Sequence, residues 1–84
     1  MKREPEFFED QELVLVFVAK RLKEALALEK VLDEDEMDYA VVPTPFVSGL
    51  LFPFQRVGAF FYVAPQSADG ARAAMAKQGF KPFK

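Results

Sequence analysis

The chain has 84 residues, of which 51% are hydrophobic, and this is enough for one small domain with a single core. It holds 11 basic and 13 acidic residues and contains no Cys, His or Trp. This composition excludes disulfides, thiolate or imidazole metal ligands and the commonest nucleophile–base pairs of enzymes. The formal net charge of −2 also argues against a protein that follows the phosphates of a nucleic acid.

The longest strongly apolar run, residues 13–19, is far shorter than the roughly 20 residues that a membrane-spanning helix needs. The first residues combine a proline with acidic side chains, unlike a secretory signal or a transit peptide. We therefore expect a cytoplasmic protein with no membrane partner. Residues 1–11 are mostly polar and predict a flexible arm, and residues 12–84 predict one α+β domain.

The first two elements follow the arm without a turn signal between them. Residues 13–19 are apolar at every position and rich in β-branched side chains, which predicts a central strand buried on both faces. Residues 20–32 are good helix formers without Gly or Pro, and the helix is expected to end near Asp33. Its predicted buried face consists of Leu22, Ala25, Leu28 and Leu32, with Leu26 at the edge.

The middle of the chain predicts two strands joined by a long connection. Residues 39–42 predict a short strand that ends at the Pro43-Thr44-Pro45 segment, and residues 46–56 predict a mostly apolar loop. Residues 57–64 predict a second strongly apolar strand, whose odd-numbered and even-numbered positions face opposite sides of the sheet.

A second helix is predicted over residues 68–78, with Ser67 as its N-cap and Gly79 as its C-terminal stop. Residues 80–83 leave room for a short edge strand. The order β-α-β-β-α, with this optional last strand, predicts a ferredoxin-like two-layer sandwich. Such a fold has an antiparallel sheet, two helices on one of its faces, and the first and third strands in its middle.

The sheet face away from the helices is usually half polar, but both predicted central strands are apolar on both faces. Leaving large apolar side chains in water costs roughly 1.5–3 kcal/mol each. Three candidates could cover this second face of the sheet: the 46–56 loop, the Phe7-Phe8 arm, or a second copy of the chain. We expect a homo-oligomer, a dimer or a trimer. Its predicted interface consists of Phe46, Leu50, Leu51, Phe52, Phe54, Phe60 and Tyr62.

The connection between the two strands is also a candidate ligand site. Two prolines fix its backbone, and Ser48 and Gly49 then offer a hydroxyl and a turn with free amides. A turn of this kind next to Arg56 suits a small anion or a carboxylate, and an ordinary hairpin connection is the competing interpretation. The predicted site, for a small molecule or a protein, consists of Pro43, Thr44, Pro45, Ser48, Gly49, Arg56 and Gly58.

Other polar groups are predicted to be structural. The acidic run 33–38 lacks the central glycine and distal glutamate of a calcium loop, so we expect no metal site there. Glu29 is either a buried carboxylate or, as we expect, a rim residue paired with Lys30, Arg56 or solvent. The basic-glycine-aromatic order of an RNA-recognition strand is not reproduced around residues 56–58. We expect neither a nucleic-acid partner nor a cofactor.

Residues 25–32, with Glu29-Lys30-Val31-Leu32 in the helix, are followed by Val41-Val42-Pro43-Thr44-Pro45. This stretch resembles a family of small bacterial selenium/sulfur carrier-like proteins, in which a similar helix precedes a Pro-x-Pro turn. The resemblance covers about residues 13–63. It implies a cysteine followed by glycine soon after the prolines, where this chain has Ser48-Gly49, so the implied carrier chemistry on sulfur is not expected here.

A second resemblance is to small signal-transducing proteins with a fold akin to the nitrogen-regulatory PII proteins. They share the order helix, strand, long loop, strand and helix, and an apolar strand before a second helix that begins like Ser67-Ala68-Asp69. Both resemblances imply an architecture more than an activity.

Without His or Cys, only Glu29, Tyr39, Tyr62, lysines and hydroxyls remain for acid–base chemistry, and the sequence pairs none of them. We therefore predict a non-catalytic regulatory or binding module that self-associates through its sheet and contacts a ligand or protein through residues 43–58. The alternative is a small dimeric ferredoxin-like enzyme or stress-type domain with a pocket between sheet and helices.

Overall fold

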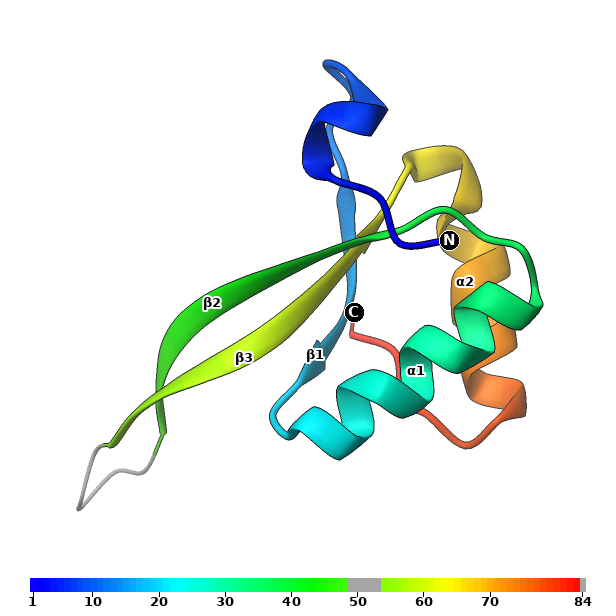
Figure 1. The fold of residues 1–84 in the computed structure, drawn as a ribbon. Helices are drawn as coiled ribbons and strands as arrows, with labels where there is room; N and C mark the ends of the chain where they lie inside the picture. The colour runs from blue at the N-terminus through cyan, green and yellow to red at the C-terminus, as the bar shows by residue number, and fades with distance from the viewer. Residues whose placement is uncertain (49–53, 84) are drawn as a thin grey trace.

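A computed structural model describes the backbone of residues 1–48 and 54–83 and the side chains of residues 1–45 and 57–83. The fold is α+β, with a three-stranded antiparallel sheet and two helices (Figure 1). The sheet order is β1-β3-β2. The elements are η1 (Pro5–Phe8), β1 (Val14–Ala19), α1 (Leu22–Glu34), β2 (Ala40–Ser48), β3 (Phe54–Val63), η2 (Pro65–Ser67) and α2 (Ala68–Lys77).

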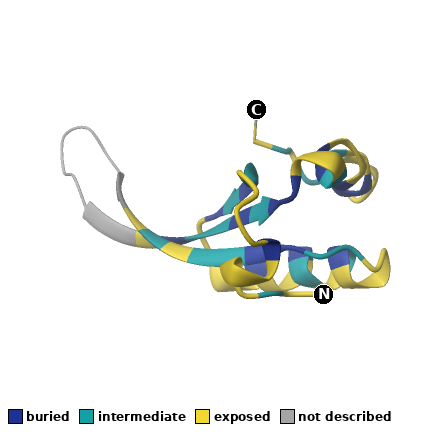
Figure 2. Ribbon diagram, turned by 90° about the horizontal axis from the view of Figure 1, so that it is seen from above, coloured by how far each residue is buried: buried dark blue, intermediate teal, exposed yellow. Residues whose placement is uncertain are grey.

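The central strand, β3, separates two different environments. Phe61 and Val63 are fully buried in the core that the sheet forms with α1 and α2. Phe60 and Tyr62 lie on the opposite face and are half-buried. The predicted assignment of odd and even positions to opposite faces is therefore confirmed, and Figure 2 shows buried segments where the sheet meets the helices.

β1 pairs with β3 as predicted, but it is an edge strand of the sheet in the described residues, not a central one. Its register shifts between Leu15 and Phe17, as in a β-bulge. The extra residue, Val16, is buried in the helix-side core together with Phe17. The uniformly apolar sequence thus reflects two successive residues on one face, with Leu15 and Val18 on the other.

Residues 80–83 do not form the predicted edge strand, although they run beside the outer edge of β1. The backbone N–H of Phe83 donates to the carbonyl of Val16 at 2.7 Å, and this single bond does not make a ladder. Gly79 has a φ of +88° and ends α2 as predicted, because a left-handed residue turns the chain back. The N–H of Phe80 then reaches the carbonyl of Met75, inside the last turn.

The two helices cover the same face of the sheet, and α1 does so with the predicted periodicity except at its first turn. α1 buries Ala25, Leu28 and Leu32, but Leu22 is 75% exposed. Leu22 was predicted to be buried; it is exposed because β1 ends at Ala19, just before the helix, and the first turn of α1 borders an open hollow instead of a strand. Ser67 lies in η2 and makes no capping hydrogen bond to α2.

β2 and β3 form a hairpin that continues past the end of β1. The last pair between β1 and β3 joins Ala19 to Ala59, whereas the pairing of β2 with β3 extends to Ser48 and Phe54. We call residues 45–48 and 54–57, which have no third strand beside them in the described part of the chain, the outer hairpin. In Figure 1 it projects away from the helices.

The predicted end of the strand at Pro43 and the predicted loop over residues 46–56 are therefore wrong for the described residues, since 46–48 and 54–56 are strand. The physical reason is the position of β2 at the sheet edge. Pro43 and Pro45 are two residues apart, so both nitrogens face the free edge, where no N–H is needed.

Candidate functional site

The predicted ligand-binding residues that the structure describes lie along the two strands of the hairpin. Pro43, Thr44 and Pro45 are on β2, and Thr44 is opposite Gly58 on β3. Both prolines are exposed, and the Thr44 hydroxyl donates to the carbonyl of Val42 at 3.2 Å. In the described residues the hydroxyl is thus engaged with its own strand.

The other predicted ligand residues are only partly described. Ser48 pairs with Phe54, and Arg56 pairs with Phe46, within the outer hairpin. The side chains of these residues are not described, and Gly49 lies outside the described residues. A turn of free amides beside Arg56 is therefore a prediction that the structure leaves untested.

The predicted interface residues on the described strands all occupy even-numbered positions, which alternate along the paired strands. The opposing pairs of this parity run from Ser48 with Phe54, through Phe46 with Arg56, to Ala40 with Tyr62. The predicted residues on it are Phe46, Phe54, Phe60 and Tyr62. Leu50, Leu51 and Phe52 lie outside the described residues.

We call the helix-free side of the three-stranded part of the sheet the open face. The pairs Leu15 with Tyr62, Val18 with Phe60 and Val42 with Phe60 place large apolar side chains next to one another across all three strands. The residues of the open face are Leu15, Val18, Val42, Phe60 and Tyr62, and each is half-buried. Together these five side chains form one apolar surface, in which the Tyr62 hydroxyl is the polar group.

One end of the open face is covered by the N-terminal arm. Phe8 of η1 is buried in a small cluster with Ala40 and Ala64, and Leu13 and Tyr62 pack against this cluster. Of the three predicted covers, the arm therefore accounts for one end of the face. The five residues of the open face nevertheless all remain partly exposed.

The arm, predicted to be flexible, lies against the sheet through its backbone as well. The N–H of Arg3 donates to the carbonyl of Tyr39 at 2.7 Å, and the N–H of Tyr39 donates to the carbonyl of Met1 at 3.2 Å. Lys2 forms a parallel bridge with Tyr39 just before β2. These bonds extend the sheet by one short segment.

Ion pairs hold the arm to the acidic run 33–38. The Arg3 Nε lies 2.9 Å from Asp38 Oδ1, and the Met1 ammonium lies 3.6 Å from Asp33 Oδ1. In the described part of the chain, no group of three Asp, Glu, His or Cys side chains could hold a metal ion. The acidic run faces the arm, a contact that the sequence analysis did not identify.

Glu29 and Tyr39, two candidates for acid–base chemistry, have structural surroundings. Glu29 is 20% exposed, and its carboxylate lies 3.3 Å from Lys2 Nζ, a partner that was not predicted. The buried Tyr39 hydroxyl donates to Asp33 Oδ1 at 2.9 Å, and its ring stacks on Phe61. Burial, and then Asp33, raise the pKa of Tyr39 well above its ordinary value.

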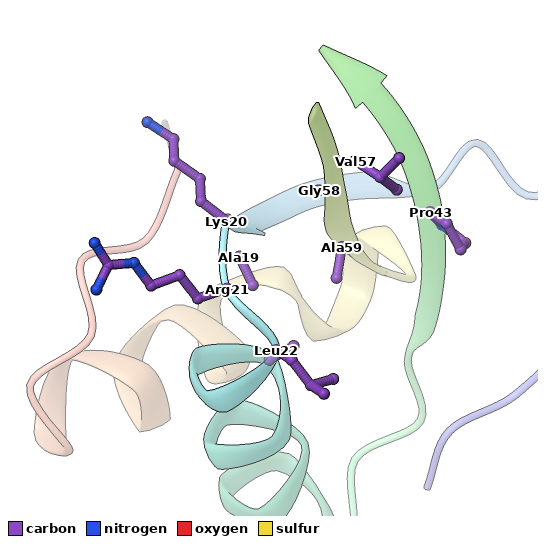
Figure 3. A pocket seen from close by; sticks show the side chains of 9 residues that line it. Ala19, Lys20, Arg21, Leu22, Pro43, Val57, Gly58 and Ala59 are labelled. Atoms are coloured by element: carbon purple, nitrogen blue, oxygen red, sulfur yellow. The ribbon is translucent and has the colours of Figure 1, made fainter. Parts of the chain in front are cut away.

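A small cavity of about 190 Å³, which we call the notch, lies between the first turn of α1 and the hairpin. It is lined by Ala19, Lys20, Arg21, Leu22, Ala25, Pro43, Val57, Gly58 and Ala59. In Figure 3 the side chains of Lys20 and Arg21 point away from Val57 and Pro43, so the walls are apolar and the charges lie at one side. Its described lining contains no carboxylate or tyrosine.

Neither the notch nor the arm contacts were predicted, and the sequence offers only weak signals for them. The charge of Lys2 and Arg3 against that of the acidic run was one such signal. Over the residues that the structure describes, no helix has the length and apolar character to cross a bilayer.

Comparisons with known proteins add no family to this description. No family model matches the chain, and no curated protein and no solved structure matches it either.

Proposed function

We propose that the protein is a non-catalytic binding module of the ferredoxin-like kind that self-associates through its open face. The observation that carries the proposal is the row of large apolar side chains around Phe60 and Tyr62, which the helices do not cover. Monomeric soluble proteins rarely expose large continuous apolar patches, and patches of this kind mark interaction sites. A cytoplasmic location and kinship with one of the two families that the sequence resembles are part of the same proposal.

The edges of the sheet favour association through the face. The free edge of β2 carries Pro43 and Pro45, which cannot donate to another strand. The free edge of β1 is flanked by the tail that bonds Phe83 to Val16. A second copy is therefore directed to the open face, where two sheets pack about 10 Å apart.

A two-fold dimer suits this surface, because the same patch then meets itself. Phe60 lies on the central strand between Val18 and Val42 and so occupies the middle of the patch. Fully burying a large apolar side chain contributes roughly 1.5–3 kcal/mol, and a half-buried one contributes part of that. Several residues together are needed, and the open face supplies five.

We extend the proposal to a ligand or partner contact along the hairpin, residues 43–58. What supports it is exposure: Pro43, Pro45 and Val57 are exposed on strands that have no third strand beyond Ala59. Such a surface suits an apolar partner segment. It gives less support to the small anion that the sequence analysis predicted.

The test is sedimentation of the wild type and of Phe60→Lys at micromolar concentration in high salt, which screens exposed charges. The wild type is expected well above the 9.5 kDa of one chain, and Phe60→Lys at that mass, because the contact would bury unpaired lysine ammonium groups against apolar side chains, a cost that salt does not remove. Phe83→Lys, an exposed aromatic outside the open face, is the matched control and keeps the wild-type mass.

Circular dichroism and thermal unfolding establish that both variants fold. A wild type that sediments as one chain over the whole micromolar range contradicts the proposal. So does a folded Phe60→Lys variant that keeps the wild-type mass.

A further inference from the structure

The notch holds the two most exposed large apolar side chains among the described residues. Leu22 is 75% exposed and Val57 is 66% exposed, and both line it. They lie on the helix side of the sheet, beyond the last pair of β1, and take no part in the open face. Exposed apolar side chains that gather in one hollow indicate a second interaction surface.

The surface beside the notch is basic. Lys20 and Arg21 line it and Lys23 follows in the first turn of α1, against one acidic residue, Glu24. The Glu24 carboxylate accepts the backbone N–H of Lys20 at 3.2 Å. None of the three basic side chains forms an ion pair with another described residue.

An exposed aromatic side chain surrounded by acidic residues lies on η1, at the other end of β1. Residues 4–12 contain five acidic residues and no basic one. Phe7 is 50% exposed there, while its neighbour Phe8 is buried and fixes the turn to the sheet. The Arg3 guanidinium lies over the Phe7 ring, 4.4 Å from its centroid. We call Phe7 with the exposed Glu4, Glu6, Glu9 and Asp10 around it the acidic knob.

We propose that the acidic knob of one copy docks into the notch of a second copy, with Phe7 against Leu22 and Val57. The carboxylates of the knob then lie beside Lys20, Arg21 and Lys23. The notch has room for an aromatic ring, since an engineered cavity of about 150 Å³ takes up benzene. The contact goes beyond the proposed open-face association, because it involves neither Phe60 nor Tyr62.

The knob and the notch of one chain cannot meet each other. η1 precedes β1 and α1 follows it, so the strand holds them at opposite ends of the sheet (Figure 1). The contact is therefore head-to-tail between copies, and each copy has one knob and one notch to offer. A small contact between unlike charges is expected to be weak and to weaken further in salt.

A mixing experiment tests this arrangement in low salt and in a Phe60→Lys background, which removes the open face. Phe7→Ser removes the knob and keeps the notch; Leu22→Ser removes the notch and keeps the knob. Each variant alone is expected to sediment as one chain. A mixture of the two restores one knob and one notch and is expected to form a one-to-one pair that grows no further.

The binding strength is measured by titrating fluorescently labelled Phe7→Ser protein with Leu22→Ser protein. High salt is expected to weaken this binding, and so is Arg21→Glu in the labelled protein, each by about tenfold or more. The matched controls are Leu26→Ser, one helical turn away and outside the notch lining, and Phe83→Ser, which is 48% exposed. In the parent background both controls keep the head-to-tail association.

No pair formation in the mixture overturns the proposal, as does association of either variant alone. These outcomes are separate from those of the open-face test, which is read in high salt on chains with an intact knob and notch. Failure of one proposal is therefore distinguishable from failure of the other.

Discussion

The two faces of β3 carry similar side chains but lie in different environments. Phe61 and Val63 are fully buried under α1 and α2, whereas Phe60 and Tyr62, the residues that immediately precede them, are half-buried with no helix over them. An apolar strand therefore specifies that both of its faces need a cover. It does not specify that the same chain provides both covers.

The largest expected difference is between alanine substitutions on these two faces. Phe61→Ala leaves a cavity in the packed core and is expected to lower the free energy of unfolding by about 3–5 kcal/mol. Phe60→Ala is expected to lower the free energy of unfolding by only about 1–2 kcal/mol at concentrations where the chain is dissociated, because its ring is not fully buried. Urea unfolding measures both. Equal losses would contradict the distinction between the faces.

A second comparison concerns the covered end of the open face. Phe8→Ala is expected to lower the free energy of unfolding by about 1–3 kcal/mol, since its ring is buried against Ala40 and Ala64. Phe7→Ala, the adjacent exposed ring, is expected to change it by about 0.5 kcal/mol or less. Urea unfolding of the pair checks this. If the two variants were equally stable, the arm would not cover the sheet in solution.

On the covered side, Tyr39→Phe removes the hydrogen bond to Asp33 and is expected to cost about 1–2 kcal/mol at neutral pH. Burial and Asp33 raise the pKa of Tyr39 in the folded state. An unfolded tyrosine has a pKa of about 10, so the stability from this group is complete below that pH and is lost as the pH rises further.

Urea midpoints measured at neutral pH and above about pH 10 test this dependence. The wild type should lose more stability over the interval than Tyr39→Phe does, since lysine titration is common to both proteins. An equal loss in the two proteins would show that Tyr39 ionises as readily in the folded chain as in the unfolded one.

The smallest expected effect is at the rim of the arm. Arg3 and Asp38 are partly exposed, so the coupling between them in a double-mutant cycle with alanine is expected to be about 0–1 kcal/mol and to shrink in salt. A coupling of several kcal/mol would instead make the ion pair, and not Phe8, the main anchor of the arm.

Much of the fold could be predicted because the spacing of apolar residues along the chain indicates which positions are buried. The helix predicted over residues 20–32 and found at Leu22–Glu34 follows from its helix-forming residues, and the burial of Leu28 and Leu32 follows from their spacing. The opposite faces of Phe60 and Phe61 follow from the alternation of a strand. Spacing could not locate the bulge at Val16, because in a run where every residue is apolar an inserted residue leaves no mark.

The candidate site was harder to predict because it depends on where strands end. Pro43 and Pro45 are typical both of a turn and of an edge strand, and only the pairing partner distinguishes the two. The exposure of Leu22 depends on β1 stopping at Ala19, which is a property of the sheet and not of the helix. The contact of Glu29 with Lys2 joins residues far apart in the sequence.

The most direct test of the central claim is an isotope-filtered nuclear Overhauser experiment on a mixture of labelled and unlabelled chains at a concentration where they associate. Contacts between copies are expected from the rings of Phe60 and Tyr62 to the methyl groups of Leu15 and Val18. Contacts between copies that involve other residues and none of these four would contradict the account.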